Sequence, residues 1–477
     1  MNTKLRFPSG FQWGTAISAF QTEMGRGLVE RPPRTDWLEW ATSAEIKQEG
    51  LVSGDDPRDG PGFWEHYRED MDSAKELGTN SIRLSIEWAR IFPESTSQVG
   101  ATVKRSPNGG VLEVNLTDKD LESLSVLADK SSVDHYIGML KYARSIGLHV
   151  FLTLYHWPLP VWLHDPVACH KNIGKSSRRG WVDQETIVEF GKYAEYAAKT
   201  FGEYVDFWET LNEPDVIAFN GYLMGPSTGF PPALSDPNLF SVVQRNLVFA
   251  HNVAYTNIKK HTSAPVGIGV STPYFEEGDN NPKSTGVVDA ARYMMYERVL
   301  NGALYGVFDN DFDGLIDERV EGFRGADFIG VDYYTRVRLR YNSDAPFNTE
   351  ILPCVDCTDF AWDIYPQGMR RVLKWVYEKY RVPIYVTENG IADSTDAKRG
   401  RFIAHHLQEV CKSINIDNIP VKGYYHWSLI DNFEWAKGYS MRFGLYEVDY
   451  KTKKRAKRRS ASVFEEICRS GEIEVET

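Results

Sequence analysis

The stretch Val150-Phe151-Leu152-Thr153-Leu154-Tyr155 is apolar along most of its length instead of at every second residue. Pro383-Ile384-Tyr385-Val386 has the same character. A strand that exposes one face to water alternates apolar and polar side chains, so continuous runs indicate strands that are buried on both faces. The two stretches therefore predict an α/β fold with a parallel sheet at its centre.

Short runs rich in β-forming residues recur along the chain, and most precede a helical pattern. Helical periodicity is clear in His135–Ser145, Glu185–Phe201 and Gly368–Tyr380. Alternating strands and helices are typical of βαβ units, and eight such units predict a (β/α)₈ TIM barrel. The predicted strands are Phe11–Ser18, Ser81–Ile86, Val150–Tyr155, Val205–Leu211, Val266–Ser271, Phe328–Tyr334, Ile384–Thr387 and Gly423–Leu429.

Three irregular stretches enlarge this pattern in a chain of 477 residues. We interpret Pro93–Lys130, Gly225–Pro237 and Tyr341–Asp359 as long βα-loop insertions at the surface. At about 150 residues per domain the length would allow three domains. No change of composition divides the chain and no repeat of solenoid period occurs, so we expect one domain over residues 1–477.

Charge and hydropathy exclude several classes of partner. The net charge is −12, from 54 Lys and Arg against 66 Asp and Glu, so we do not expect nucleic acid as a partner. No stretch approaches the about 18 uninterrupted apolar residues of a membrane span, and residues 1–14 lack the apolar segment of a signal peptide. We therefore expect a cytoplasmic protein that does not contact membranes.

Polar and aromatic side chains follow most of the predicted strands. Catalytic residues of a (β/α)₈ barrel come from the carboxyl ends of several strands, so we expect these side chains to meet. Two glutamates on different strands, among amide, imidazole, guanidinium and indole groups, suit glycosidic bond hydrolysis, and aromatic rings suit sugar faces. The candidates are Gln21, Glu23, Arg83, Glu87, His156, Trp157, Asn212, Glu213, Tyr333, Tyr334, Glu388, Asn389, His426, Trp427, Asp431, Glu434 and Trp435.

Five motifs resemble the signatures of glycoside hydrolase family 1. Thr210-Leu211-Asn212-Glu213-Pro214 and Tyr385-Val386-Thr387-Glu388-Asn389-Gly390 contain the two glutamates. Phe11–Ala16, Arg83–Pro93 and His426–Trp435 are the other three, and all five occur in the order and spacing of the family. Two further stretches are most similar to the archaeal β-glycosidases of this family, Tyr155–Asp165 and Gly438–Gly444.

The resemblance implies a retaining β-glycosidase that needs no cofactor and no metal. Glu388 takes the position of the nucleophile, and Glu213 takes that of the general acid and base. Arg83 and Tyr334 take positions beside the nucleophile, where a guanidinium and a hydroxyl favour the anion. A retaining mechanism predicts carboxyl groups about 5–5.5 Å apart.

The same resemblance implies the sugar contacts. Asn212 would bind the 2-hydroxyl, Trp427 would lie under the sugar ring, and Glu434 would accept hydrogen bonds from the 4- and 6-hydroxyls. A carboxylate at Glu434 would repel a 6-phosphate, so we expect an unphosphorylated sugar. The 3- and 4-hydroxyls would be held by Gln21, His156 and Trp435.

We therefore expect an exo-acting enzyme that hydrolyses terminal non-reducing β-D-glucosides and β-D-galactosides through a covalent glycosyl-enzyme. Its partners would be small β-glycosides or oligosaccharides. The sequence does not decide whether the chain forms a homo-oligomer. A β-mannosidase of the same family is an alternative, because contacts too fine to identify from sequence decide the orientation of one hydroxyl. A non-catalytic sugar-binding protein on the same scaffold is another, although the retained pair of glutamates argues against it.

Asp332 departs from the family pattern, which usually has Asn before the tyrosine pair. An ionised Asp332 near the site would raise the pKa of both catalytic carboxyls. A hydrogen-bonded Asp332 behind the site would leave both unchanged. The sequence does not separate these alternatives, which concern the pH optimum rather than the reaction.

Three other motifs resemble ligand-binding sequences, but each has a simpler structural interpretation. Asp309–Gly314 begins like a calcium loop, but Val320 stands where the twelfth position requires Glu, which favours a turn. Cys354 and Cys357 have no second pair at zinc spacing, which favours free thiols or a local disulfide. The basic run Lys451–Arg459 is interpreted as a solvated surface.

Overall fold

The computed structural model describes residues 2–28, 31–323 and 325–476. Within these residues eight parallel strands close into a barrel, and they follow one another around it in chain order. Each predicted strand corresponds to one barrel strand, so the predicted (β/α)₈ TIM barrel is confirmed. The barrel strands are β2 (Gln12–Ala16), β3 (Ser81–Ser85), β6 (His149–Tyr155), β7 (Phe207–Asn212), β8 (Val266–Ser271), β12 (Phe328–Asp332), β15 (Ile384–Asn389) and β16 (Val421–Trp427).

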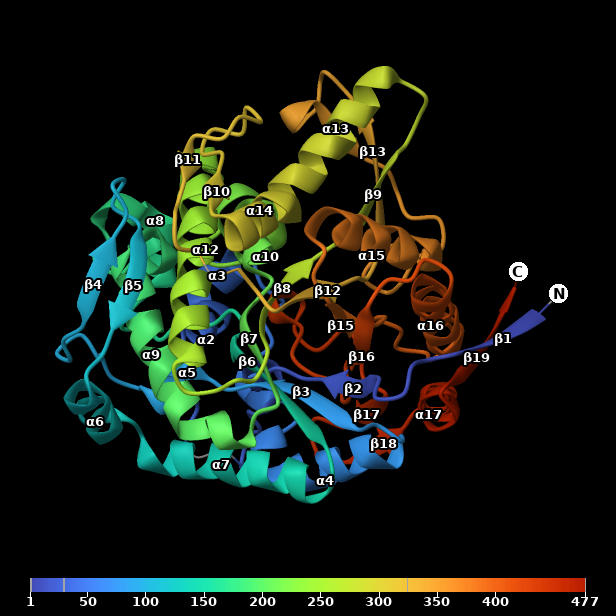
Figure 1. The fold of residues 1–477 in the computed structure, drawn as a ribbon, viewed down its shortest axis with the longest axis horizontal. Helices are drawn as coiled ribbons and strands as arrows, with labels where there is room; N and C mark the ends of the chain where they lie inside the picture. Colours follow the sequence, from blue (N-terminus) through green and yellow to red (C-terminus); the bar gives the residue numbers. More distant parts are fainter. Residues whose placement is uncertain (1, 29–30, 324, 477) are drawn as a thin grey trace.

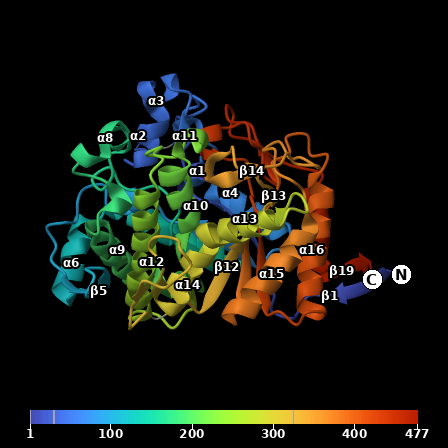
Figure 2. The ribbon, with the colours of Figure 1, turned by 90° about the horizontal axis from the view of Figure 1, so that it is seen from above.

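Helices follow the barrel strands and lie around the outside of the barrel (Figure 1, Figure 2). The helix predicted over His135–Ser145 begins earlier, at Lys130, because the Asp129 carboxylate caps it by accepting from the backbone N–H of Ser132 at 2.9 Å. The covering helices are α4 (Phe63–Glu76), α7 (Lys130–Ser145), α9 (Glu185–Phe201), α12 (Pro237–Lys259), α14 (Arg298–Tyr305), α15 (Pro366–Tyr380), α16 (Arg399–Asn415) and α17 (Ala461–Ser470).

The inside of the barrel has an aromatic lower layer. The Phe151 ring of β6 lies 5.2–5.9 Å, between ring centroids, from four rings carried by other strands on several sides of the barrel. Gly14 makes room for one of them, since a Cβ there would come within 2.2 Å of the Tyr425 ring. The four rings belong to Phe207, Phe328, Tyr385 and Tyr425.

Polar side chains form the next layer toward the carboxyl ends of the strands. Successive inward-facing residues of a strand are two positions apart, so Phe207 is followed inside the barrel by Glu209, and Phe151 by Thr153. The Thr153 hydroxyl donates to Glu209 at 2.7 Å. Thr387 stands two residues after Tyr385 and donates to a carboxylate of β12 at 2.6 Å. The aromatic layer therefore supports a buried polar layer directly above it.

The predicted insertion Pro93–Lys130 is only partly at the surface. It contains a hairpin of β4 (Thr102–Arg105) and β5 (Val111–Asn115), followed by α6 (Asp118–Leu127). Val111 and Val114 are fully buried, and the Asn257 side chain of α12 donates to the Val114 carbonyl at 3.1 Å. The apolar residues of β5 therefore pack on α9 and α12, which the polar average composition of the stretch conceals.

The other two insertions also contain short elements. In Gly225–Pro237 the chain forms α11 (Gly225–Thr228). Tyr341–Asp359 contributes to a small sheet of β9 (Tyr274–Glu277), β13 (Arg336–Tyr341) and β14 (Thr349–Ile351). Of the two states left open for Cys354 and Cys357, the structure has the local disulfide.

The interpretation of Lys451–Arg459 as a solvated surface is wrong for part of the run. The Arg455 side chain is buried against Asp70, with nitrogen and oxygen 2.8 Å apart, and Arg458 is buried against Asp431 at the same distance. Both carboxylates lie on other elements of the fold, so the sequence run alone gives no sign of them. Asp309 does form the predicted turn, by accepting from the backbone N–H groups of Phe312 and Gly314.

The remaining elements are short. β1 and β19 pair antiparallel, so the two ends of the chain lie side by side at the edge of the molecule (Figure 1). No helix among the described residues is long and apolar enough to cross a membrane. The short elements are β1 (Asn2–Arg6), α1 (Ala19–Thr22), α2 (Asp36–Thr42), α3 (Ala44–Gln48), α5 (Trp88–Ile91), α8 (Pro166–Asn172), α10 (Pro214–Ala218), α13 (Pro282–Arg292), β10 (Val307–Phe308), β11 (Glu318–Arg319), β17 (Tyr446–Val448), β18 (Arg455–Lys457) and β19 (Glu472–Glu476).

Replacing Phe151 by Ala removes the ring that joins the aromatic layer. Because the surrounding rings are held by different strands, the cavity cannot collapse, and we expect the free energy of unfolding to fall by about 3–5 kcal/mol. The matched control is Val126→Ala on α6, where the side chain is 85% exposed and we expect a change below about 0.5 kcal/mol. Denaturant unfolding of both variants measures the difference, and equal midpoints would contradict the layered interior.

Candidate active site

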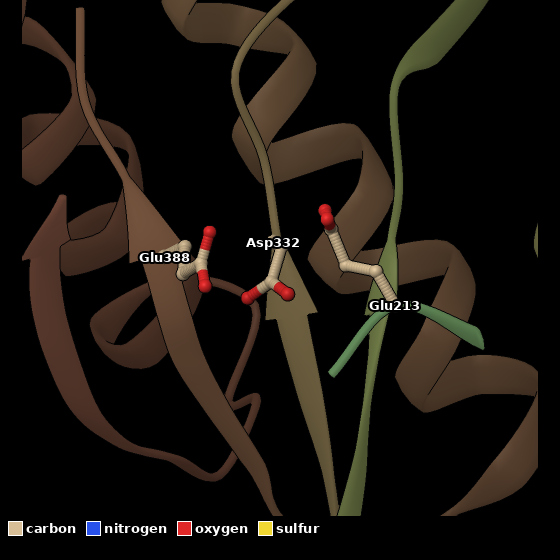
Figure 3. A group of neighbouring side chains, drawn as sticks. All are labelled: Glu213, Asp332 and Glu388. Carbon is tan, nitrogen blue, oxygen red and sulfur yellow. The ribbon is translucent and has the colours of Figure 1, made fainter. Parts of the chain in front are cut away.

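Three carboxyl groups meet at the carboxyl ends of the barrel strands. Glu388 belongs to β15, Asp332 ends β12, and Glu213 directly follows β7. One oxygen of each carboxyl lies within 4.8 Å of one oxygen of the other two. Figure 3 shows the three side chains pointing into one common space, with Asp332 between the two glutamates. The strands thus bring together residues that are far apart in the sequence.

Arg83 of β3 is the cation beneath these carboxyls. It is fully buried. Its Nη1 donates to Glu388 at 2.6 Å, and its Nη2 donates to Glu209 and to the Asn212 side-chain oxygen, both at 2.5 Å. A guanidinium presents several donors in a fixed plane, so one side chain can orient all three acceptors.

The Glu388 carboxylate accepts from two sides. Arg83 donates to Oε1, and the Tyr334 hydroxyl donates to Oε2 at 2.6 Å. The His156 ring lies 4.0 Å from Oε1, and burial together with the Arg83 charge holds the pKa of His156 well below its usual range, so this ring is neutral. Two charge-assisted hydrogen bonds stabilise the charged form of Glu388.

Glu213 stands in a different environment. It is 6% exposed, and no ion pair involving it occurs among the described residues. Burial raises the pKa of Glu213 well above its usual range, and the Glu388 charge acts in the same direction. One carboxyl of the pair is therefore prepared as an anion and the other as a neutral acid, which is the division that acid-base chemistry requires.

Backbone conformation is unusual at three positions in the site. Trp157, Glu213 and Trp435 have positive φ angles of 85°, 46° and 49°. The left-handed region is unfavourable for residues with a Cβ, and such residues persist where the surrounding structure holds them. At Glu213 the chain turns from β7 into α10, and this turn places the carboxyl above the end of the barrel.

Aromatic rings form one side of the site. The His156 ring is stacked with Trp427, at 5.7 Å between centroids, and with Trp435 at 6.3 Å. Trp157 lies 4.4 Å from Trp435, and its indole N–H donates to the Asn212 carbonyl at 3.1 Å. These flat, mostly apolar surfaces beside buried polar groups match the two kinds of surface of a sugar ring.

Gln21 and Glu434 form the polar end of this side. The Gln21 amide nitrogen donates to the Glu434 carboxyl at 3.3 Å. The Ser18 hydroxyl donates to the Gln21 side-chain oxygen at 2.6 Å. Burial raises the pKa of Glu434 to about 8, with a further contribution from the Glu388 charge. In the free protein Glu434 is therefore mostly protonated at neutral pH.

The structure brings together every residue for which the family resemblance implied a role. Contacts join Gln21, Arg83, His156, Asn212, Tyr334, Glu388, Trp427, Glu434 and Trp435 into one group beside Glu213. Their chemical roles remain predictions.

Other candidates from the strand ends make different contacts. Glu23 pairs with Arg90, Asp431 pairs with Arg458, and Glu87 caps α5. Adjacency to a strand end was therefore too weak a criterion on its own. Conversely, Glu209 was not among the candidates, although it accepts from Arg83 and Thr153. Its inward position, two residues after Phe207, was the available signal.

The fold and site together define a glycosidase, and comparisons with known proteins give its family. The chain belongs to glycosyl hydrolase family 1, whose family model matches residues 3–103 and 126–473. The chain is 36% identical to a β-galactosidase of Saccharolobus solfataricus, over 98% of this chain and 96% of that protein. It is 28% identical to β-glucosidase A of Thermotoga maritima, over 99% of this chain and 100% of that protein. The resemblance stated from the motifs is confirmed, including the similarity to archaeal members.

Solved structures agree with this assignment. The β-glycosidase of the hyperthermophile Thermosphaera aggregans superposes with a TM-score of 0.92 at 38% identity, covering 98% of both chains. A family 1 β-glucosidase from Thermotoga maritima gives a TM-score of 0.81 at 26% identity, covering 98% of this chain and 99% of that one. The barrel and its connections are thus those of the family.

The raised pKa of Glu434 makes stability depend on pH. Between its ordinary value of 4.5 and about 8 the folded state holds a proton that the unfolded state has released, so rising pH through this window weakens the fold. Glu434→Gln does not titrate, so we expect its free energy of unfolding, relative to the wild type, to increase by more than about 1 kcal/mol across the window. Denaturant unfolding at the two ends of the window measures the change. The exposed Glu122→Gln is the control, and a constant difference for Glu434→Gln would contradict a buried proton.

Proposed function

We propose that this protein is a retaining, exo-acting β-glycosidase that releases terminal β-D-glucose and β-D-galactose from non-reducing ends. The observation that carries the proposal is the pair Glu213 and Glu388, with oxygens within 4.8 Å and opposite electrostatic environments. So short a separation is below the about 6.5–9.5 Å that an inverting pair needs to place a water beside the sugar, and it suits direct attack on the sugar by one carboxylate. The chain would act as one domain.

In the first step, Glu388 attacks the anomeric carbon while Glu213 gives its proton to the leaving oxygen. A bond forms between Glu388 and the sugar, the glycosidic bond breaks, and the aglycone departs as an alcohol. Arg83 and Tyr334 hold the Glu388 oxygens in position for attack. The proton on Glu213 is available because burial and the Glu388 charge raise its pKa.

In the second step the charge pattern reverses. Glu388 is now an uncharged ester, so the contribution of its charge to the raised pKa of Glu213 disappears, and Glu213 becomes a base. It takes a proton from water as the water oxygen attacks the anomeric carbon. The ester bond breaks, Glu388 leaves as a carboxylate, and the sugar is released with its original anomeric configuration.

The neighbouring side chains would orient the sugar. Asn212, held by Arg83 and in contact with His156 at 3.2 Å, is placed for the 2-hydroxyl beside Glu388. The Trp427 ring would lie against the apolar face of the sugar. Contacts to the other hydroxyls would come from Gln21, His156, Glu434 and Trp435.

Removal of the proposed nucleophile tests the reaction. With nitrophenyl β-D-glucoside and β-D-galactoside we expect Glu388→Gln to lose about 10³-fold or more of kcat, while the exposed control Glu122→Gln keeps full activity. Proton NMR of the first sugar released should show the β-anomer. Release of the α-anomer would contradict retention, and no turnover by the wild type would favour a binding protein. A larger rate on the β-mannoside would change the sugar but keep the mechanism.

Selection against 6-phosphorylated sugars should depend on pH. Because the pKa of Glu434 is raised to about 8, its repulsion of a phosphate strengthens as it ionises. We expect the ratio of kcat/KM for a plain β-glucoside over its 6-phosphate to rise by about tenfold between about pH 7 and about pH 9, where the phosphate is already dianionic. The Glu434→Gln variant should show a constant ratio. A wild-type ratio that is equally constant would mean that the Glu434 charge does not select the substrate.

A further inference from the structure

Asp332 is a third buried carboxyl that the proposed reaction does not use. Its side chain lies between Glu213 and Glu388 (Figure 3), and the residue is 1% exposed. Its Oδ1 accepts from the Thr387 hydroxyl at 2.6 Å. Its Oδ2 is buried without a hydrogen-bond partner among the described residues. A buried carboxylate oxygen without a donor is costly, and a proton on it removes the buried negative charge, which is the larger part of that cost.

The charges around Asp332 do not balance. Arg83, the one cation near Asp332 among the described residues, donates to Glu209 and to Glu388. Neither Asp332 nor Glu213 forms an ion pair within the described part of the chain. Next to Asp332, β8 carries no titratable side chain. The titratable groups that face Asp332 are Arg83 of β3, Glu209 of β7, Glu213 after β7, Glu388 of β15, and Tyr334 after β12.

The surroundings of both Asp332 and Glu213 favour a proton on the carboxyl. Burial and the Glu388 charge raise the pKa of both Asp332 and Glu213 well above the usual range. Against the Glu209 charge, the Arg83 charge and the Thr387 hydroxyl favour the anion of Asp332, whereas the Glu213 carboxyl accepts no side-chain hydrogen bond among the described residues. For Glu213, the Arg83 charge contributes least among its neighbours.

We propose, resting on the glycosidase function above, that Asp332 is a positioning residue that holds a proton beside the Glu388 anion and releases it to solvent before Glu213 does as the pH rises. No bond of the substrate changes in this step. The negative charge left on Asp332 stands within 4.8 Å of Glu213. It keeps the general acid protonated at a higher pH than a neutral residue there would allow.

The same proton fits the charge changes of the reaction. The free enzyme has one anion in this group of three, at Glu388. After the first step Glu388 is an ester and Glu213 is the anion, so the group again has one negative charge. Asp332 lies close to both and stays neutral through the cycle at moderate pH, so the moving charge meets no second buried anion.

Asp332→Asn tests the proposal because it keeps the shape and the acceptor for Thr387 but cannot ionise. At low pH Asp332 is protonated and resembles Asn, so we expect the acid limb of the kcat/KM profile to stay in place. The alkaline limb should move to lower pH by about one to two units, since Glu213 loses the charge that retained its proton. Movement of both limbs would show that Asp332 is charged throughout, and movement of neither would show that it never ionises in this range. Either result overturns the proposal.

A second variant checks the same assignment through the partner of Asp332. Thr387→Val removes the hydroxyl that favours the Asp332 anion, so Asp332 should ionise later and the alkaline limb should move partway toward its position in Asp332→Asn. In the double variant, Thr387→Val should cause no further movement. If Thr387→Val moved the alkaline limb equally in the wild type and in Asp332→Asn, the proposal would be contradicted.

Infrared difference spectra give a readout that does not need turnover. The spectrum of the wild type minus that of Asp332→Asn should contain the C=O stretch of a protonated carboxyl at about pH 6, and this band should disappear as the pH rises. Absence of the band at about pH 6 would overturn the proposal. If the wild type hydrolysed no glycoside but showed this band, the proposed function would fail and the assignment of the proton would stand.

Discussion

The contact between the Arg83 guanidinium and its three acceptors is the interaction on which the site depends. A fully buried cation is tolerated only when its donors are satisfied, and Arg83 bonds Glu388, Glu209 and Asn212 together. Without Arg83, two buried carboxylates would face each other with no compensating charge. Arg83 therefore orients the proposed nucleophile, the amide beside it and the end of β7 together.

The barrel supports that contact through two layers of side chains in its interior. Rings around Phe151 fill the lower part. Two positions further along β6, β7 and β15 stand the polar residues Thr153, Glu209 and Thr387, whose side chains are hydrogen-bonded within the layer above. Because β6, β7 and β15 contribute to both layers, their polar groups cannot shift without disturbing the aromatic packing. This coupling holds the carboxyls of Glu213 and Glu388 at a short distance although they stand on separate strands.

Local patterns in the sequence were sufficient to predict the barrel, because strands buried on both faces and helical periods are properties of short segments. The proposed nucleophile and acid were predicted from the motifs that surround them. Glu209 was missed because its role depends on Arg83, a residue of another strand. The burial of Arg455 and Arg458 was missed for the same reason, since their carboxylate partners Asp70 and Asp431 are remote in sequence. The protonation of Glu434 also depends on surroundings that only the folded chain provides.

The left-handed backbone at Trp157, Glu213 and Trp435 has a consequence for how this chain can change. Each such residue costs the fold about 1 kcal/mol or more, and glycine would relieve that cost. Selection for stability alone would therefore replace these three side chains, whereas selection for the proposed catalysis would keep them. A descendant that no longer turned over substrate would be free to accumulate glycine at these positions. Loss of function would then be visible in backbone torsions as well as in missing carboxylates.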